Sequence, residues 1–289
     1  MKQVNSLCFV FSSVGSRLSA SLAGLALALV SSLGYANVDS AGAVVMSVGR
    51  NTATAVQGVV RTLNKDASIY SGELMNTGPN SYLNLRFDDG AFFLLRPETR
   101  FEIQEHHTAP SVKAAAAAAA PKVAAPGTRP AAPLAPVVGA IERGSETSRA
   151  FMSLLKGGFR SVSGLIGKLN HDEYRITTPV ATIGIRGTRY SARVCDAKDR
   201  DGKGECADRD ELVSLLRDAG SLVDEGQTLL ITHIEDGSIE IVTPTETRIQ
   251  GLGTTFITIS NGNIILVNGL PSIEQQELHM SPDICGLGN

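Results

Sequence analysis

The stretch TPVATIGIRGTRYSARVC, which runs from Thr178 to Cys195, carries the most information about the fold. Gly184 and Gly187 are separated by two residues, a spacing that superficially matches a phosphate-binding loop. Such a loop needs a helix directly behind its glycines, because the backbone N–H groups at the helix start must point at the phosphate. The residues that follow here, TRYSARVC, alternate as in a strand. Since glycines inside strand patterns mark a bulge, a bend or a close backbone approach, the stretch predicts β-structure rather than a nucleotide site.

Individual residues of this stretch have expected backbone roles. Pro179 should hold the chain extended before the strand, because its ring fixes φ and it has no N–H to donate to a ladder. Gly184 and Gly187 should permit a bend or a tight contact. Arg186 lies between apolar neighbours, so we expect it to pair with an acidic or carbonyl group rather than with a ligand. If the backbone needs Gly187, Gly187→Val should unfold the domain, whereas a ligand loop would stay folded and lose binding.

The segments 38–107 and 228–273 also have the alternation and the turn residues of strands. In SYLNLRFDDGAFFLLRP the pair Asp89-Gly90 separates two apolar runs, which is a strong hairpin signal. The pairs Asp236-Gly237 and Asn261-Gly262 predict further hairpins or corners.

Two strand-and-turn segments resemble each other. FDDGAFFLLRPETRFEI from Phe87 and IEDGSIEIVTPTETRIQ from Ile234 share an acid-Asp-Gly turn, a proline and a Thr-Arg ending, offset by one inserted residue. Repeated units of this kind favour a solenoid or roll whose rungs bury one core. The alternative is chance convergence, because such turns are common. The expected fold is therefore all-β and solenoid-like or a β-roll, with one or two short helices.

An abrupt change of composition interrupts the strands. APSVKAAAAAAAPKVAAPGTRPAAPLAP, from Ala109 to Pro136, is almost entirely Ala and Pro. The seven alanines could form two turns of helix, but the segment offers no apolar face to bury and its prolines break a helix repeatedly. We therefore predict a disordered or extended linker inserted in the fold.

Two short segments have helical periodicity. In SETSRAFMSLLKGG, Phe151, Leu154 and Leu155 would share a helix face, and Gly157-Gly158 would end the helix. A second helix is predicted from Asp210 to Ala219, where apolar residues line one side: Leu212, Leu215 and Leu216.

The first 36 residues have the layout of a cleaved secretory signal peptide. Lys2 and Arg17 precede an uncharged apolar run from Leu18 to Leu33, and Gly34-Tyr35-Ala36 supplies small residues for cleavage after Ala36. An uncleaved membrane anchor is the rival, but the run is shorter than the roughly 20 residues that span a bilayer. Cys8 lacks the small preceding residue of a lipidated cysteine. We expect a periplasmic protein without stable membrane insertion.

Charge and cysteine content limit the partners and the compartment. Without Lys2 and Arg17 the 26 basic residues become 24 against 29 acidic ones, and no basic cluster is large enough to follow a phosphate backbone, so nucleic acid is not an expected partner. The mature chain would keep Cys195, Cys206 and Cys285. In an exported protein an odd count predicts one disulfide with a spare thiol, or an intermolecular bond.

CDAKDRDGKGECADRDE, which begins at Cys195, is an acidic cluster with two interpretations. Asp199, Asp201 and Asp208 partly match a calcium-binding loop, but the first ligand position holds Ala197 and the last holds Asp rather than Glu. A charged hairpin tip clamped by a Cys195–Cys206 disulfide fits better. The calcium-stabilised structural module is the weaker interpretation.

Motifs for catalysis are missing from the sequence: there is no G-x-S-x-G elbow, H-E-x-x-H, Walker loop or paired-cysteine zinc spacing. We therefore predict no enzyme activity, cofactor or metal. His106 and His107 are expected to be a solvated pair rather than a metal site, because adjacent strand residues face opposite ways. His233, in an apolar strand, is expected to be packed or at an edge.

GGFRSVSGLIGKLNHDEYRITTPVATIGIRGTRYSARVC resembles the signature region of the FecR-type periplasmic domain, the sensor portion of iron-citrate regulators. GVVRTLNKDASIYSGELMNTGPNSYLNLRFDDGAFFLLRPETRFEI is similar to the opening half of that domain. The resemblance implies an all-β domain with solenoid-like rungs and no catalytic residues. Its specific string comprises Thr178, Pro179, Ala181, Thr182, Gly184, Arg186, Gly187 and Thr188.

The signalling members of that family carry a cytoplasmic anti-sigma segment and a membrane helix before the sensor domain, whereas only 17 residues precede the apolar run here. Direct control of a sigma factor is therefore not expected. The predicted function is a non-catalytic recognition or scaffold module for an envelope protein or outer-membrane component, with a role in signalling. The alternative is a cell-wall or carbohydrate-binding protein, or an enzyme acting on such material, although a chain with zero Trp and five Tyr has few rings to stack on sugars.

The expected organisation follows from these patterns. It comprises the signal peptide (1–36), the first part of the FecR-type domain (37–108), the Ala/Pro linker (109–140), the second part with the signature motif (141–195), an acidic loop with a short helix (196–225), C-terminal strands (226–275) and a tail (276–289).

Overall fold

The computed structural model describes residues 40–119, 147–196, 206–224 and 226–278. The predicted signal peptide, Asp199, Asp201 and Cys285 lie outside these ranges. Strands dominate the described residues, so the all-β fold class is confirmed. Among the helices in these ranges, none is both long enough and apolar enough to cross a membrane.

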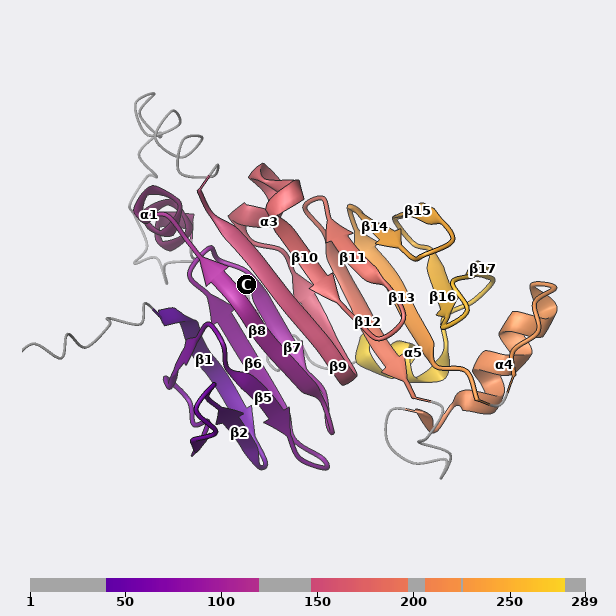
Figure 1. The fold of residues 1–289 in the computed structure, drawn as a ribbon, viewed down its shortest axis with the longest axis horizontal. Coiled ribbons are helices and arrows are strands. Elements are labelled where there is room, and N and C mark those ends of the chain that lie inside the picture. The colour runs from indigo at the N-terminus through magenta and orange to yellow at the C-terminus, as the bar shows by residue number, and fades with distance from the viewer. Residues whose placement is uncertain (1–39, 120–146, 197–205, 225, 279–289) are drawn as a thin grey trace, which may run out of the picture. The chain divides into compact units, whose positions relative to one another are not determined.

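The strands form two layers of nine that share one strand, β9 (Arg149–Val162). In sheet A the order is β4 (Ser68–Tyr70), β1 (Ser40–Val48), β6 (Tyr82–Phe87), β7 (Phe92–Leu95), β9, β12 (Arg189–Cys195), β13 (Leu229–Asp236), β16 (Thr255–Ile259) and β17 (Ile264–Val267). In sheet B it is β3 (Val60–Thr62), β2 (Asn51–Thr54), β5 (Leu74–Thr77), β8 (Arg100–His107), β9, β10 (Tyr174–Thr177), β11 (Thr182–Ile185), β14 (Ser238–Val242) and β15 (Thr247–Gly251). Only the β9–β10 pairing is parallel among those described, and β9 lies in the middle of the strands (Figure 1).

The strand β9 passes from one sheet to the other at a pair of glycines. Its first part, up to Lys156, pairs with β8 and β10 in sheet B, and its second part, from Gly157, pairs with β7 and β12 in sheet A. Gly157 has φ +81°, and a Cβ there would lie closer than 3 Å to Thr99, so only glycine fits. Gly158 leaves room for the stems of Arg96 and Arg193. The helix predicted over SETSRAFMSLLKGG is therefore wrong: the two glycines turn a strand between sheets instead of ending a helix.

The core between the sheets is built from alternate residues of facing strands. A chain of aromatic contacts crosses it, with ring centroids 5.3 Å apart for Phe93–Phe101, 5.1 Å for Phe93–Phe159 and 5.6 Å for Phe159–Tyr190. Phe101 belongs to sheet B and the other rings to sheet A, so the contacts join the two layers. Such tilted and edge-to-face pairs contribute beyond the burial of their area.

The Ala/Pro insert joins two neighbouring antiparallel strands, β8 and β9, and its beginning is ordered. Ala109 N donates to Ser148 Oγ at 3.0 Å, so the insert leaves and re-enters the sheet at one place. The helix α1 (Pro110–Ala119) buries Val112 and Ala116 beside the β6–β7 turn, which corrects the prediction of a structureless linker for these ten residues. The prediction failed because two small apolar residues at helical spacing suffice to pack a short helix. Residues 120–140 lie outside the described ranges.

A second, separate apolar cluster lies on the other face of sheet A. It contains outward-facing Leu229 and Ile231 of β13 with Leu212 and Leu216 of α4 (Arg209–Asp218). The predicted helix over 210–219 is thus confirmed. The helix α5 (Ser272–Leu278) lies beside α4, because Ser272 donates its N–H and hydroxyl to Glu211. We call α4 and α5 the outer layer. Two smaller elements, α3 (Leu165–Leu169) and the 3-10 turn η1 (His171–Glu173), connect β9 to β10.

The two segments that look alike in sequence are not structurally equivalent. In the first, Asp89-Gly90 makes the predicted hairpin between β6 and β7, and the proline segment crosses to sheet B. In the second, Asp236-Gly237 makes the crossing from β13 to β14, and the proline segment makes the hairpin. The similarity therefore reflects shared turn chemistry rather than a repeated unit. Asn261-Gly262 makes the predicted hairpin between β16 and β17.

Candidate functional site

The signature stretch begins with a turn organised by Thr178. Its Oγ1 accepts from the N–H of Ala181 at 3.0 Å and of Val180 at 3.2 Å, and the hydroxyl donates to Ala181 O at 2.8 Å. Pro179 is exposed between β10 and β11, and its expected role in holding the chain extended stays a prediction. Thr178 thus supplies side-chain bonds that the backbone of the tight turn cannot make for itself.

The two glycines of the stretch differ in what they do. Gly187 has φ +67° and lies where the chain crosses from β11 in sheet B to β12 in sheet A, which confirms a bend at this position. Thr188 closes the crossing by donating its hydroxyl to Ser238 O. Gly184 instead sits in regular register between Arg175 and Glu240, and a Cβ there would make only ordinary contact with Glu240 at 3.7 Å. The expected bend at Gly184 is therefore wrong.

Arg186 is exposed at this crossing, and only its backbone N–H has a described bond, to Ser238 O at 3.2 Å. The expected partner for its guanidinium is not found within the described ranges. The remaining residues of the string are structural: Thr182 pairs with Val242 in sheet B, and Ala181 is buried in the core between the sheets. The string thus forms a turn, a strand and a crossing.

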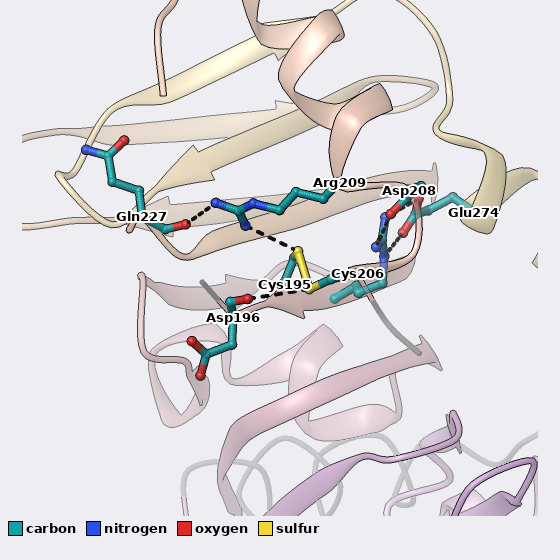
Figure 2. Close-up of a disulfide and its surroundings, with 8 residues drawn as sticks. Cys195, Asp196, Cys206, Asp208, Arg209, Gln227 and Glu274 are labelled. Atoms are coloured by element: carbon teal, nitrogen blue, oxygen red, sulfur yellow. Dashed lines mark hydrogen bonds and ion pairs between the residues drawn. A yellow bond between two sulfur atoms is a disulfide. The ribbon is translucent and has the colours of Figure 1, made fainter. Parts of the chain in front are cut away.

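The disulfide between Cys195 and Cys206 is present, as predicted (Figure 2). It joins the end of β12 to the start of α4 across a sequence separation of 11 residues, and both cysteines are buried at 0% and 1% exposure. Arg209 Nη1 approaches Cys195 Sγ at 3.5 Å, while its Nη2 donates to Gln227 O at 2.8 Å. In the chain-entropy model a loop of this length stabilises the fold by about 2–3 kcal/mol.

Beside the disulfide, Arg193 is fully buried between two carboxylates. It donates two bonds of 2.8 Å to Asp208 and bonds of 2.6 and 2.9 Å to Glu274, so it ties β12 to the start of α4 and to α5. Burial alone would lower the pKa of Arg193, but Glu274 and Asp208 outweigh it and raise that pKa. Burial raises the pKa of Asp208, which Arg193 only partly offsets. Arg193 offsets only part of the shift in the pKa of Asp208, because its one guanidinium is shared by two buried carboxylates.

The calcium interpretation gains no support from Asp208. Both of its carboxylate oxygens accept from Arg193, an arrangement that does not present them to a cation. Across the described ranges, no group of three or more His, Cys, Asp or Glu side chains is placed to hold a metal ion.

The expectation of a solvated histidine pair is wrong for His106. Its side chain is 1% exposed, stacks on Phe87 with centroids 4.7 Å apart, and holds Nε2 3.7 Å from Asp89 Oδ1. Thr108 Oγ1 lies 3.5 Å from His106 Nδ1. The order Thr, His, Asp resembles a catalytic triad, but both distances exceed those of a working one and the imidazole is sealed from solvent. His107 is exposed, so the two rings do face opposite ways.

Asp89 acts as a structural acceptor in this region. Its Oδ1 accepts from Ala91 N at 3.0 Å, and its Oδ2 lies 3.3 Å from Ile166 N at the start of α3. A Cβ at Gly164 would overlap the carboxylate, so that glycine lets the chain pass. Burial raises the pKa of Tyr174 well above its ordinary value, and Tyr190 and Asp89 add to the effect. Asp89, Tyr174 and Tyr190 thus form a group of polar side chains buried in the core.

The other broad feature is the outer face of sheet B, the side away from the core. Across the nine strands runs one continuous row of cross-strand partners: Val60, Thr54, Leu74, Glu102, Ser153, Thr177, Thr182, Val242 and Thr247. At the usual strand spacing the row spans roughly 40 Å. Exposed side chains on this face include Arg175, Thr177, Thr247 and Ile249, the last at 62%. The face therefore mixes cationic, anionic, hydroxyl and aliphatic groups.

Sequence reasoning missed this row and the Arg193 cluster. The row depends on the register in which β9 pairs with β8 and β10. The sequence did not reveal this register, because the apolar periodicity of β9 resembled that of a helix. Arg193 lies 15 residues from Asp208 and 81 from Glu274, so no local pattern joins them. The sequence did contain one indication of the cluster. Arg193 lies between apolar neighbours in YSARVC, and a charge that is buried among strands needs a partner.

No protein-family model matches the chain. No curated protein matches it either. Among solved structures, two crystal structures of a "putative anti-sigma factor" from Parabacteroides distasonis ATCC 8503 are similar, each with 11% identity and with TM-scores of 0.39 and 0.38. The matches cover 72% of this chain and 64% and 65% of those chains, so this chain spans less than two thirds of their length. At these TM-scores the likeness carries no argument about function.

Proposed function

We propose that the chain is an exported recognition module that acts in the periplasm without catalysis, and that it binds an envelope protein through the outer face of sheet B. The observation that carries the proposal is the unbroken row from Val60 to Thr247 across nine strands, flanked by exposed Arg175 and Ile249. A surface with guanidinium, carboxylate, hydroxyl and aliphatic groups has the mixture found at non-obligate protein interfaces.

Two further features support export and recognition. The leader over residues 1–36 has the pattern of a secretory signal, and a buried disulfide is typical of proteins that fold in an oxidising compartment. The resemblance of the signature string to FecR-type sensor domains favours a role in envelope signalling. Both lines of support are independent of the surface itself.

The test is site-specific photo-cross-linking in the organism that makes the protein. A photoreactive residue at Thr177, on the outer face of sheet B, should capture one reproducible envelope protein. The same residue at Arg217, which is exposed on α4, is the matched control and should not capture it. Adding Arg175→Glu and Ile249→Asp should abolish capture at Thr177 without changing circular dichroism, because both side chains are exposed.

Equal capture from both positions, or none from Thr177, would contradict the proposal. A partner that survives Arg175→Glu with Ile249→Asp would mean that binding lies elsewhere on the molecule.

A cell-wall glycan is the second candidate ligand, and the neighbouring hydroxyls of Thr177 and Thr182, with Thr247 two strands further along the row, are the observation that favours it. Co-sedimentation with purified peptidoglycan distinguishes the two: the glycan function predicts saturable binding that Thr177→Ala with Thr182→Ala weakens, whereas the protein-partner function predicts none.

A further inference from the structure

The molecule has two apolar cores that share no residue. The first lies between the sheets, and the second lies between the outside of sheet A and α4. Cys195 and Cys206 both belong to the second core, where they meet Leu212, Leu229 and Ile257. Loss of the second core alone would therefore leave the first one intact.

Among the residues that the structure describes, the bonds identified between the outer layer and sheet A are few. The helix α4 has ten residues and buries two leucines, Leu212 and Leu216, and helices of this length are marginal on their own. The ion cluster around Arg193 reaches both helices, but desolvation of buried charges consumes much of their attraction. The disulfide is the one covalent link described between sheet A and α4 other than the chain itself.

We propose that the Cys195–Cys206 disulfide is a redox-controlled lock on the outer layer: oxidised, it holds α4 on sheet A, and reduced, it lets α4 and α5 detach while the two sheets stay folded. Detachment would expose the outward apolar side chains of sheet A, among them Leu229, Ile231, Ile257 and Ile259. This inference does not depend on the proposed recognition role, because it concerns the opposite sheet.

The reduction is a thiol–disulfide exchange with a dithiol. Because both cysteines are buried, the exchange requires a transient opening of α4 that admits the dithiol. One thiolate of the dithiol then attacks Cys206 Sγ, the S–S bond breaks, and Cys195 leaves as a thiolate that takes up a proton. The second thiolate of the dithiol attacks the mixed disulfide, so Cys206 is released as a thiol and the dithiol becomes a disulfide, with two electrons transferred. The guanidinium of Arg209, 3.5 Å from Cys195 Sγ, favours Cys195 as the leaving thiolate.

Hydrogen exchange of the full-length mature protein tests the lock. The oxidised protein is compared with protein reduced by dithiothreitol and then alkylated, and with Cys195→Ser/Cys206→Ser. In both open forms, amides of α4 should exchange about 30- to 150-fold faster, the factor expected from the entropy of the opened loop. Amides of β7, β9 and β12 should keep their rates, and the open forms should bind an apolar dye.

Unchanged exchange in α4 after complete reduction would overturn the proposal. So would acceleration throughout both sheets, since the disulfide would then stabilise the whole fold rather than one layer.

The role of Arg209 is tested by a matched pair of variants. Arg209→Gln removes the positive charge near Cys195, whereas Arg209→Lys keeps one, and both replacements retain a hydrogen-bond donor. Reduction of the disulfide, followed by thiol titration, should be several-fold slower in Arg209→Gln than in Arg209→Lys. Equal rates would remove Arg209 from the mechanism.

Discussion

The core between the sheets and the outer layer on sheet A are stabilised in different ways. Between the sheets, interlocking rings and aliphatic side chains from many strands exclude water, and no single bond decides the arrangement. The cluster between the outer layer and sheet A has only nine buried residues among those that the structure describes, and the outer layer relies on a disulfide and on one buried arginine between two carboxylates. The core between the sheets should therefore tolerate the loss of one polar contact, whereas the outer layer should not.

The largest effect is expected in the core between the sheets. Phe159 contacts Phe93, Phe101 and Tyr190, so Phe159→Ala should lower the free energy of unfolding by about 3–5 kcal/mol through lost burial and the remaining cavity. Urea denaturation followed by circular dichroism measures it. Leu155→Ala, on the same strand but 40% exposed, is the control and should cost well under half as much. Equal costs would mean that the aromatic contacts do not hold the sheets together.

Under the outer layer, Arg193→Met should lower the free energy of unfolding by about 3–5 kcal/mol, because it leaves Asp208 and Glu274 buried without their cation. Adding Asp208→Asn and Glu274→Gln should recover most of the lost free energy of unfolding, because it removes the uncompensated charges. Denaturation of the single and triple variants provides the comparison. Failure of the triple variant to recover would show that packing of Arg193, and not its charge, holds the layer.

Three glycines in different surroundings, of which only Gly157 lies on β9, should respond to alanine in a graded way. Gly157→Ala should cost about 2–4 kcal/mol, because a positive φ is combined with overlap on Thr99. Gly220→Ala, with φ +76° and open space, should cost about 1–2 kcal/mol. Gly184→Ala, with neither problem, should be neutral or slightly stabilising. Thermal denaturation gives the order, and a cost for Gly184 equal to that for Gly157 would refute it.

The smallest effect is a dependence on pH from His233, which lies on the outer face of sheet A. Burial lowers its pKa below the ordinary 6.5, although Glu235 and Glu274 oppose the shift. The unfolded chain therefore takes up a proton more readily, so this group should reduce stability as pH falls from about 6.5 through the lowered pKa. The difference in melting temperature between wild type and His233→Gln should change as pH falls through that window and stay constant below it. A difference that does not vary with pH would exclude His233 as the cause.

Local chemistry made the hairpins and the disulfide predictable from the sequence. Asp-Gly and Asn-Gly pairs force turns wherever they fall between apolar runs, and Cys195 and Cys206 flank one charged loop. The domain boundaries at 37, 109, 141, 196 and 226 and the calcium interpretation stay predictions.

The rest depended on contacts between distant residues. In β9 the buried Ala150, Met152 and Leu154 alternate as in a strand, but Phe151, Leu154 and Leu155 fit a helix face equally well, and paired glycines follow either element. His106 is buried because Phe87 and Asp89 come from another hairpin. The helix α1 packs through Ala116, which a run of identical alanines does not distinguish.

We infer that β9 unites both sheets in one cooperative unit, whereas the outer layer is a separate one. Native-state hydrogen exchange of the oxidised protein in low urea tests it most directly. Amides on both sides of Gly157 should exchange only through global unfolding, with one common opening free energy, and amides of α4 should exchange through a smaller opening. Different opening free energies for the two parts of β9, or α4 amides that exchange only globally, would contradict it.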